Sequence, residues 1–308
     1  MRRRPSRLGT ATAAVLITVP LVAGCEAKVY GTPPGVAAPQ LTVVAPMGTA
    51  APLPQSPPDE AIAGYDGLLS RAEQATAEAA KAGADISAVV LDRTTNTTVT
   101  NGNGDPTPIA SVAKLFIADD LLLQDATGQT QLSPDDRTAL DGMLRSSDDS
   151  AAENFWNRGG GNAIITRVAA RYGLGSTTPP YDGHWWNTMS TTSDLVHYYD
   201  MLLQGAGGLP PERAQIIIGN LSQSTPNGID GYPQRFGIPD GLFGEPVAVK
   251  QGWMCCWNGD NWMHMSTGII GTDRRYVMAI GSMQPTDDST ARDTITQAVK
   301  TMFPGGRI

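Results

Sequence analysis

The sequence predicts an α+β fold in which a block of helices is inserted between two groups of strands. Three observations support this: helical spacing of apolar residues at both ends of the domain, short apolar runs of strand length next to them, and a middle part rich in helical patterns. Strands grouped apart from helices argue for α+β layers and against a parallel doubly wound sheet. With 308 residues, 41% of them hydrophobic, the chain can bury a large core.

The first part of the domain begins with an alanine-rich helical pattern at residues 59–82, which Gly83 can end. Residues 86–92 read as a buried strand, and residues 97–101 as its hairpin partner. A strongly apolar helix opens at Ser111. The expected helices of the block include residues 111–123, 162–172 and 193–203.

The last part of the domain returns to strands and ends in an amphipathic helix. The expected elements are strands at residues 246–251, 262–270 and 276–283, and a helix at residues 289–303. The domain at residues 59–308 therefore divides into a sheet part, about 59–105 and 212–308, and a helical part, about 106–211.

Residues 1–24 read as a lipoprotein signal peptide. Four arginines precede an apolar run at residues 8–23, which is too short for a comfortable membrane span and contains Pro20. The run ends in the sequence VAGC, whose cysteine is Cys25, and this resembles a bacterial lipoprotein box. We expect the thiol of Cys25 to carry a diacylglycerol. The alternative is an ordinary signal peptide with a cysteine by chance, and export by either Sec or Tat stays open.

Residues 25–58 predict a disordered tether rich in proline and alanine, because such a composition buries too little apolar surface to offset ordering. The tether would hold the domain at the outer face of the cytoplasmic membrane. Removing the four arginines of the signal peptide changes the formal charge from −8 to −12. That acidity argues against nucleic acid as a partner and leaves the lipid on Cys25 as the expected membrane contact.

Three short motifs follow one another along the chain: Ser111-Val-Ala-Lys114, Ser147-Asp148-Asp149 and Lys250-Gln251-Gly252. Ser111 and Lys114 are one helical turn apart and share a helix face. A lysine buried among apolar residues can have its pKa lowered enough to take a hydroxyl proton. The alternative is a helix-capping serine with a solvated lysine.

In order and spacing, these motifs resemble the Ser-x-x-Lys, Ser-x-Asn and Lys-Thr/Ser-Gly pattern of penicillin-recognising serine enzymes: class A β-lactamases, penicillin-binding proteins and D-alanyl-D-alanine peptidases. The stretches around Ser111 and at residues 224–256 are similar to the LppW-type lipoproteins of actinobacteria. The resemblance implies a five-stranded antiparallel sheet flanked by terminal helices, with an inserted all-helical domain.

The resemblance also implies roles for the motif residues. Ser111 would be the nucleophile, Lys114 its base and Ser147 the group that relays the proton to the leaving nitrogen. Ser147 or Asp148 could instead cap the helix that follows, and capping is compatible with catalysis.

The third motif implies substrate contacts. Lys250 would bind a substrate carboxylate, and Gly252 would let the substrate backbone lie against the strand edge. The amide of Trp253, with that of Ser111, would form an oxyanion hole.

Three departures from the family pattern limit the expected chemistry. Asp149 stands where the family has an asparagine that donates to the substrate, and an ionised carboxylate cannot donate. Gln251 replaces a hydroxyl with a bulkier amide. Residues 173–192 contain no glutamate and only one acid, Asp182, although class A enzymes place their deacylating glutamate on this loop. The missing base argues against efficient β-lactam hydrolysis.

The remaining candidates are weaker. The three histidines have no metal-ligand spacing, so neither a metal nor another cofactor is expected. The sequence His184-Trp185-Trp186 either lines a pocket mouth or covers a core edge. Cys255 and Cys256 are adjacent, and they form either a vicinal disulfide beside the cleft or two buried thiols.

Two functions remain open on the sequence. The first is a lipid-anchored serine acyl hydrolase, or slow acyl-enzyme former, that acts on β-lactams or peptidoglycan stem peptides. Ser111 and Lys114 favour it. The second is a catalytically degenerate envelope module that kept the fold for binding, which Asp149, Gln251 and the missing glutamate favour.

Overall fold

The structure is a computed structural model, and it describes residues 64–308. The predicted signal peptide, Cys25, the tether and the start of the first predicted helix lie outside the described residues. Within residues 64–308, no helix is both long and apolar enough to span a bilayer.

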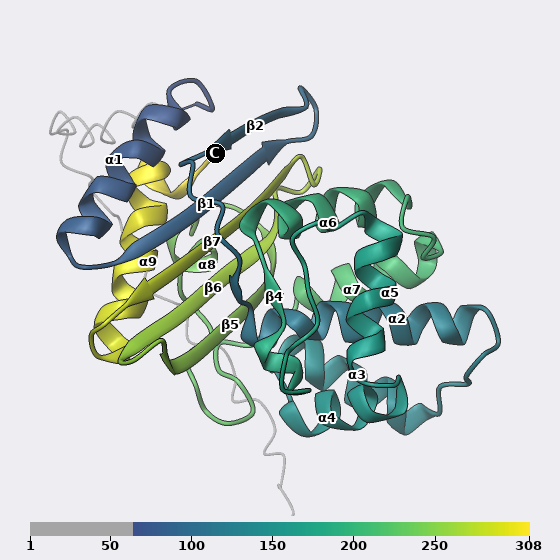
Figure 1. Cartoon of the computed structure of the whole chain (residues 1–308). Helices are drawn as coiled ribbons and strands as arrows, with labels where there is room; N and C mark the ends of the chain where they lie inside the picture. The colour runs from purple at the N-terminus through teal and green to yellow at the C-terminus, as the bar shows by residue number, and fades with distance from the viewer. Residues whose placement is uncertain (1–63) are drawn as a thin grey trace, which may run out of the picture. The chain divides into compact units, whose positions relative to one another are not determined.

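A five-stranded sheet forms the centre of the sheet part (Figure 1), with the strand order β2-β1-β7-β6-β5. Every neighbouring pair is antiparallel. The strands are β1 (Asp85–Asp92), β2 (Thr97–Thr100), β5 (Val247–Trp257), β6 (Asn261–Ile270) and β7 (Tyr276–Gln284). β5 is therefore an edge strand, with one side free of strand partners.

The helices agree closely with the predicted elements, and the predicted α+β fold is confirmed. They are α1 (Leu68–Lys81), α2 (Lys114–Ala126), α3 (Pro134–Arg145), α4 (Asp149–Arg158), α5 (Asn162–Tyr172), α6 (Thr192–Gln204), α7 (Pro211–Leu221), α8 (Ile238–Gly241) and α9 (Asp288–Met302). Short 3₁₀ turns are η1 (Ala110–Ala113), η2 (Trp185–Asn187) and η3 (Pro304–Gly306).

Several boundaries differ from the prediction. Strand β5 continues to Trp257 instead of ending at residue 251, and α1 begins at Leu68 instead of residue 59. The helix expected to open at Ser111 begins with the 3₁₀ turn η1 and becomes α-helical only at Lys114. The predicted limit of the helical part near residue 211 lies at the start of α7, and α7 packs on α2 and α3. Helix α7 also packs on β5, so it contacts both parts of the domain.

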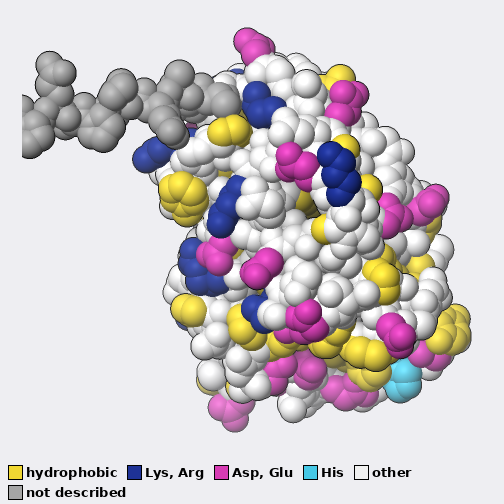
Figure 2. All heavy atoms as spheres, turned by 90° about the vertical axis from the view of Figure 1, so that its left-hand side faces the viewer, with side chains coloured by type: hydrophobic (Ala, Val, Ile, Leu, Met, Phe, Trp, Pro, Cys, Tyr) yellow, Lys and Arg dark blue, Asp and Glu magenta, His cyan; other side chains and the backbone are white. Residues whose placement is uncertain are grey.

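The terminal helices α1 and α9 pack together on one face of the sheet (Figure 1). A core of alanine, isoleucine and valine side chains lies between these helices and the sheet. Its residues come from both helices and from β1, β6 and β7. Figure 2 views the molecule from this side, where acidic and basic side chains are intermixed, so this face has no continuous basic surface.

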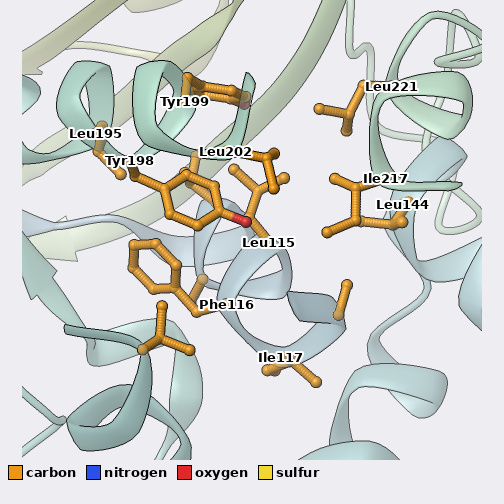
Figure 3. Packing of buried hydrophobic residues seen from close by; sticks show 14 of the residues in the cluster. Leu115, Phe116, Ile117, Leu144, Leu195, Tyr198, Tyr199, Leu202, Ile217 and Leu221 are labelled. Atoms are coloured by element: carbon orange, nitrogen blue, oxygen red, sulfur yellow. The ribbon is translucent and has the colours of Figure 1, made fainter. Parts of the chain in front are cut away.

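Helix α2 lies at the centre of the helical part and is buried on nearly every side. Figure 3 shows Leu115, Phe116 and Ile117 leaving α2 in different directions, with side chains of α6 and α7 around them. A helix with apolar residues on all faces belongs inside a protein. This packing holds the start of α2, and with it Lys114, in a fixed place beside the sheet.

A small second sheet joins two distant segments next to the start of α2. Strand β3 (Thr107–Pro108) pairs with β4 (Met189–Ser190), and the amide of Ile109 donates to the carbonyl of Thr188 at 3.0 Å. This pairing holds η2 next to η1.

Candidate active site

Ser111 and Lys114 lie side by side at the junction of η1 and α2. Lys114 Nζ is 2.9 Å from Ser111 Oγ, and both side chains are buried. Ala110, directly before the serine, has a φ of +43°, a left-handed conformation that is rare for a residue with a Cβ. Such strain persists only where the surroundings impose it, and it clusters at functional sites.

Ser147 joins this pair from the turn before α4. Lys114 Nζ donates to the carbonyl of Ser147 at 2.7 Å and lies 3.2 Å from its Oγ. The cap of α4 is Asp148, whose Oδ1 accepts from the amides of Ser150 and Ala151. Ser147 has a φ of +60° and does not cap the helix. Its hydroxyl is therefore available to Lys114 and to Lys250.

Lys250 completes the group from the edge strand β5. Its Nζ donates to Ser147 Oγ at 2.8 Å and to the carbonyl of Gln251 at 3.1 Å, and the side chain is 1% exposed. The polar atoms of Ser111, Lys114, Ser147 and Lys250 thus form one continuous hydrogen-bonded chain. We call these four residues the Ser–Lys–Ser–Lys chain.

Burial lowers the pKa of both lysines. For Lys114, desolvation is the largest cause, and the nearby charge of Asp149 opposes it. For Lys250, desolvation lowers the pKa well below the usual lysine range, and the charge of Lys114 lowers it further. Two buried lysines that share one close carboxylate favour a state in which only one of them is charged.

The hydrogen-bond partners of Lys114 fit a neutral amine as well as an ammonium. Its contacts include two oxygens that only accept, the Ser147 carbonyl at 2.7 Å and Asp149 Oδ1 at 2.5 Å. A neutral amine has two hydrogens for these acceptors, and its lone pair can face the Ser111 hydroxyl. This geometry allows a neutral Lys114 to accept the proton of the Ser111 hydroxyl.

Asp149 lies at the entrance of this site. One carboxylate oxygen contacts Lys114, while 73% of the side chain is exposed. A substrate that approaches Ser111 from solvent on this side meets a negative charge.

Gly252 brings β5 against the turn that carries Ser111. A Cβ at this position would lie 2.4 Å from the carbonyl oxygen of Ile109, so only glycine fits without a shift of the backbone. The contact places the following residue, Trp253, beside η1. The Trp253 ring stacks on Tyr232 with the ring centres 4.3 Å apart.

The structure does not bring Gln251 to the Ser–Lys–Ser–Lys chain. Side chains of neighbouring strand residues point to opposite faces, and Lys250 takes the face toward Ser147. The Gln251 amide instead donates to the carbonyls of Gln234 and Phe236 at 3.1 and 2.6 Å, and its side chain is buried. This geometry corrects the expectation that Gln251 replaces the family's hydroxyl at the substrate.

The loop at residues 173–192 covers Lys114 with an indole. The ring centre of Trp185 lies 4.7 Å from Lys114 Nζ, and the side chain is 3% exposed. Asp182, the only acid of this loop, accepts from the side chain of Asn187 and the amide of His184. No carboxylate of the loop contacts the Ser–Lys–Ser–Lys chain among the described residues.

Two contributors to the site carry no motif in the sequence. Gln234 ties the loop after α7 to the turn before Ser147, donating to the carbonyls of Arg145 and Thr225 at 3.0 Å. Trp185 belongs to the sequence His184-Trp185-Trp186, which could either line a pocket mouth or cover a core edge. Only the pairing of β3 with β4 brings Trp185 to Lys114. A polar residue in a loop gives no periodic signal, so Gln234 could not have been found.

Cys255 and Cys256 lie near the end of β5, where the strand register shifts, and both are exposed. Their Sγ atoms lie 1.94 Å apart, at bonding distance. Because the two cysteines form a disulfide, alkylation of the denatured protein without reductant is expected to label neither of them. Labelling of both would contradict the vicinal disulfide, and labelling after reduction is the control.

Comparison with known proteins agrees with this architecture. No protein-family model matches the chain. Over the whole length of both chains, it is 59% identical to proteins named "Putative lipoprotein LppW" in Mycobacterium tuberculosis and Mycobacterium bovis.

Solved structures of the same fold are only distantly similar in sequence. PBP-A matches with a TM-score of 0.62 at 18% identity, over 76% of this chain and 94% of its own. The class A β-lactamase of Mycobacterium abscessus matches with 0.59 at 19%, over 75% and 97%. A β-lactamase of Chitinophaga pinensis matches with 0.61 at 16%, over 75% and 97%. At such identities the likeness shows the fold alone. The chain therefore belongs to the LppW lipoprotein family, with a domain of the class A β-lactamase and penicillin-binding-protein fold.

Proposed function

We propose that this protein is a serine acyl-transfer enzyme that forms a long-lived acyl-enzyme with a β-lactam or a peptidoglycan stem peptide. The observation that carries the proposal is the buried hydrogen-bonded chain Ser111–Lys114–Ser147–Lys250. A purely structural role would not require two lysines to be buried within reach of one serine, because burying an ammonium without full charge pairing is costly.

Acylation would proceed by attack of Ser111 Oγ on the substrate carbonyl carbon while Lys114 takes the hydroxyl proton. The carbon–nitrogen bond of the substrate then breaks, and Ser147 passes a proton to the leaving nitrogen, replaced from Lys114. The product is an ester on Ser111 and an amine, which departs with the leaving group of a peptide but stays within the acyl group of a β-lactam. Amides of Ser111 and Trp253 would stabilise the oxyanion.

Deacylation would be slow. It needs a base to activate water, and the loop at residues 173–192 offers the Trp185 indole over Lys114 instead of a carboxylate. Among the described residues, Asp149 is the one carboxylate in contact with the Ser–Lys–Ser–Lys chain, and its contacting oxygen is already engaged by Lys114. The ester is therefore expected to accumulate. A mutant of PBP-A, a protein of this fold, has been solved as an acyl-enzyme with penicillin G.

The second candidate is a binding module without turnover. The turned-away side chain of Gln251 and the carboxylate of Asp149 favour it, because both weaken recognition of an anionic substrate.

The test is intact-mass spectrometry after incubation with benzylpenicillin. We expect a single adduct that persists for hours and is absent from Ser111→Ala. Because Lys114 must be neutral, the adduct should form faster as pH rises, and this rise should lie below the ordinary lysine pKa of about 10.4, since burial lowers that pKa.

Absence of an adduct with several β-lactams over the accessible pH range would favour the binding module. Rapid turnover without accumulation of the adduct would contradict slow deacylation. Loss of that turnover in Asp149→Asn would then identify Asp149 as the base. Lys114→Met, which keeps most of the length of the side chain but not its base, is expected to acylate at least a hundredfold more slowly.

We further propose that the domain is held on the outer face of the cytoplasmic membrane by a lipidated Cys25. The LppW relatives named as lipoproteins support this. Stable anchoring takes at least two acyl chains, and a lipidated N-terminal cysteine carries them. Cys25→Ala is expected to move the protein from the detergent phase to the aqueous phase on phase separation. Equal partitioning of both proteins would contradict the anchor.

A further inference from the structure

A groove of about 730 Å³ adjoins the site and has no role in the acyl-transfer steps. Its size lies within the range of about 300–1,000 Å³ that is usual for ligand pockets. One wall is a face of α4, and the other is Trp185 and Trp186 of η2. The α4 side chains that line it are all polar: Asp149, Ser150, Glu153, Asn154, Asn157 and Arg158.

The polar wall is built to hydrogen-bond. The side chains of Ser150 and Asn154 make no hydrogen bond within residues 64–308. Glu153 is held in place, since Asn157 donates to one of its oxygens at 3.0 Å and the Trp185 indole donates to the other at 3.2 Å. The guanidinium of Arg158 is paired with Asp136, so the groove offers little free positive charge.

The opposite wall is a rigid aromatic surface. The Trp186 ring is half-buried, stacks on His184 with ring centres 4.5 Å apart, and lies at 89° to Trp185. The stacked His184 ring and the edge-to-face Trp185 ring fix the orientation of Trp186, so a ligand that packs on it loses little free energy in ordering the ring.

This combination selects among ligand classes. A peptide that binds as an added strand needs a free strand edge, and the walls here are a helix and a 3₁₀ turn. An anionic ligand would meet Asp149 and Glu153. A pyranose has an apolar C–H face for the indole and a rim of hydroxyls for amide and carboxylate partners.

We propose that the groove binds an uncharged pyranose glycan, with Trp186 under the sugar ring and Asn154 and Glu153 on its hydroxyls. At its Asp149 end the groove reaches Lys114, so the bound glycan would lie beside the acyl-transfer site. That placement, but not the glycan binding, rests on the proposed function.

The test is a calorimetric titration of the full chain carrying Ser111→Ala with a tetrasaccharide of N-acetylglucosamine. We expect saturable binding with a dissociation constant below about 1 mM. Trp186→Ala should weaken it by at least about tenfold, and Asn154→Ala by severalfold. Tyr181→Ala is the matched control, because Tyr181 is an exposed aromatic of the same loop that does not line the groove, and it should leave binding unchanged.

Absence of binding at several millimolar saccharide, or equal loss in Trp186→Ala and Tyr181→Ala, would overturn the proposal. Binding of a stem peptide that depends on Trp186, with no binding of the saccharide, would also overturn it. Every titration uses Ser111→Ala, which lacks the nucleophile, so the glycan-binding result does not depend on whether penicillin acylates the wild type. Glycan binding and acyl transfer can therefore be contradicted separately.

Discussion

Asp149→Asn is expected to raise the rate at which benzylpenicillin acylates Ser111 by about tenfold, which corresponds to about 1.4 kcal/mol of barrier. The substitution removes an exposed negative charge that faces the approaching penicillin carboxylate. It also replaces an acceptor with an amide that can donate to the substrate. Because Asp149 opposes the lowering of the Lys114 pKa, its loss should increase the fraction of neutral base. The measurement is the rate of adduct formation by intact mass.

Glu153→Gln is the matched control for this experiment. Glu153 lies one turn further along α4 and is exposed, but it contacts Trp185 and Asn157 rather than Lys114. The Glu153→Gln substitution removes the same formal charge and should change the acylation rate much less. A neutral penicillin ester should gain less from Asp149→Asn than benzylpenicillin does. If Asp149→Asn acylates no faster than the wild type, the charge of Asp149 does not limit the approach of the anionic penicillin.

Arg171→Ala is expected to lower the free energy of unfolding by about 3–5 kcal/mol, because it leaves a carboxylate buried without its charge partner. Asp119 on α2 is completely buried and pairs with Arg171 of α5. Tyr172 donates to the same carboxylate at 2.6 Å, and Tyr198 lies 3.3 Å from it. In a domain of this size such a loss lowers the melting temperature by roughly 6–20 °C. Denaturant unfolding followed by circular dichroism measures it.

The neighbouring pair provides the comparison. Arg167 and Asp120 lie on the same two helices, but the arginine is 43% exposed. Water can replace part of that interaction, so Arg167→Ala should cost clearly less. If the two variants lose the same stability, the burial of Asp119 does not determine the cost.

Much of the fold could be predicted because its signals are local. The apolar spacing of residues 162–172 and the apolar run at residues 276–283 each report directly on one buried face. α5 therefore occupies the predicted residues, and β7 ends within one residue of its prediction. The boundary at Ser111 was missed because a 3₁₀ turn and an α-helix share the same apolar pattern.

The sequence by itself identified the residues that meet at the candidate site. Ser111, Lys114, Ser147 and Lys250 stand in three ordered motifs, and the resemblance of those motifs to penicillin-recognising enzymes predicted that they meet. The same reading assigned Gln251 to the substrate, although alternation along β5 sends it to the opposite face from Lys250. It left open whether Ser147 or Asp148 caps α4, since both can accept the same amides.

Only the tertiary structure decided what surrounds those residues. Trp185 lies over Lys114 because β3 pairs with β4, some eighty residues apart in sequence. Gly252 is required by the carbonyl of Ile109, and not by its own strand. Burial of the two lysines, which lowers their pKa values, depends on α2, α4 and β5 meeting at one point. Contacts between distant segments leave no periodic pattern in a single chain, so motifs can identify the reacting groups but not the environment that sets their charge.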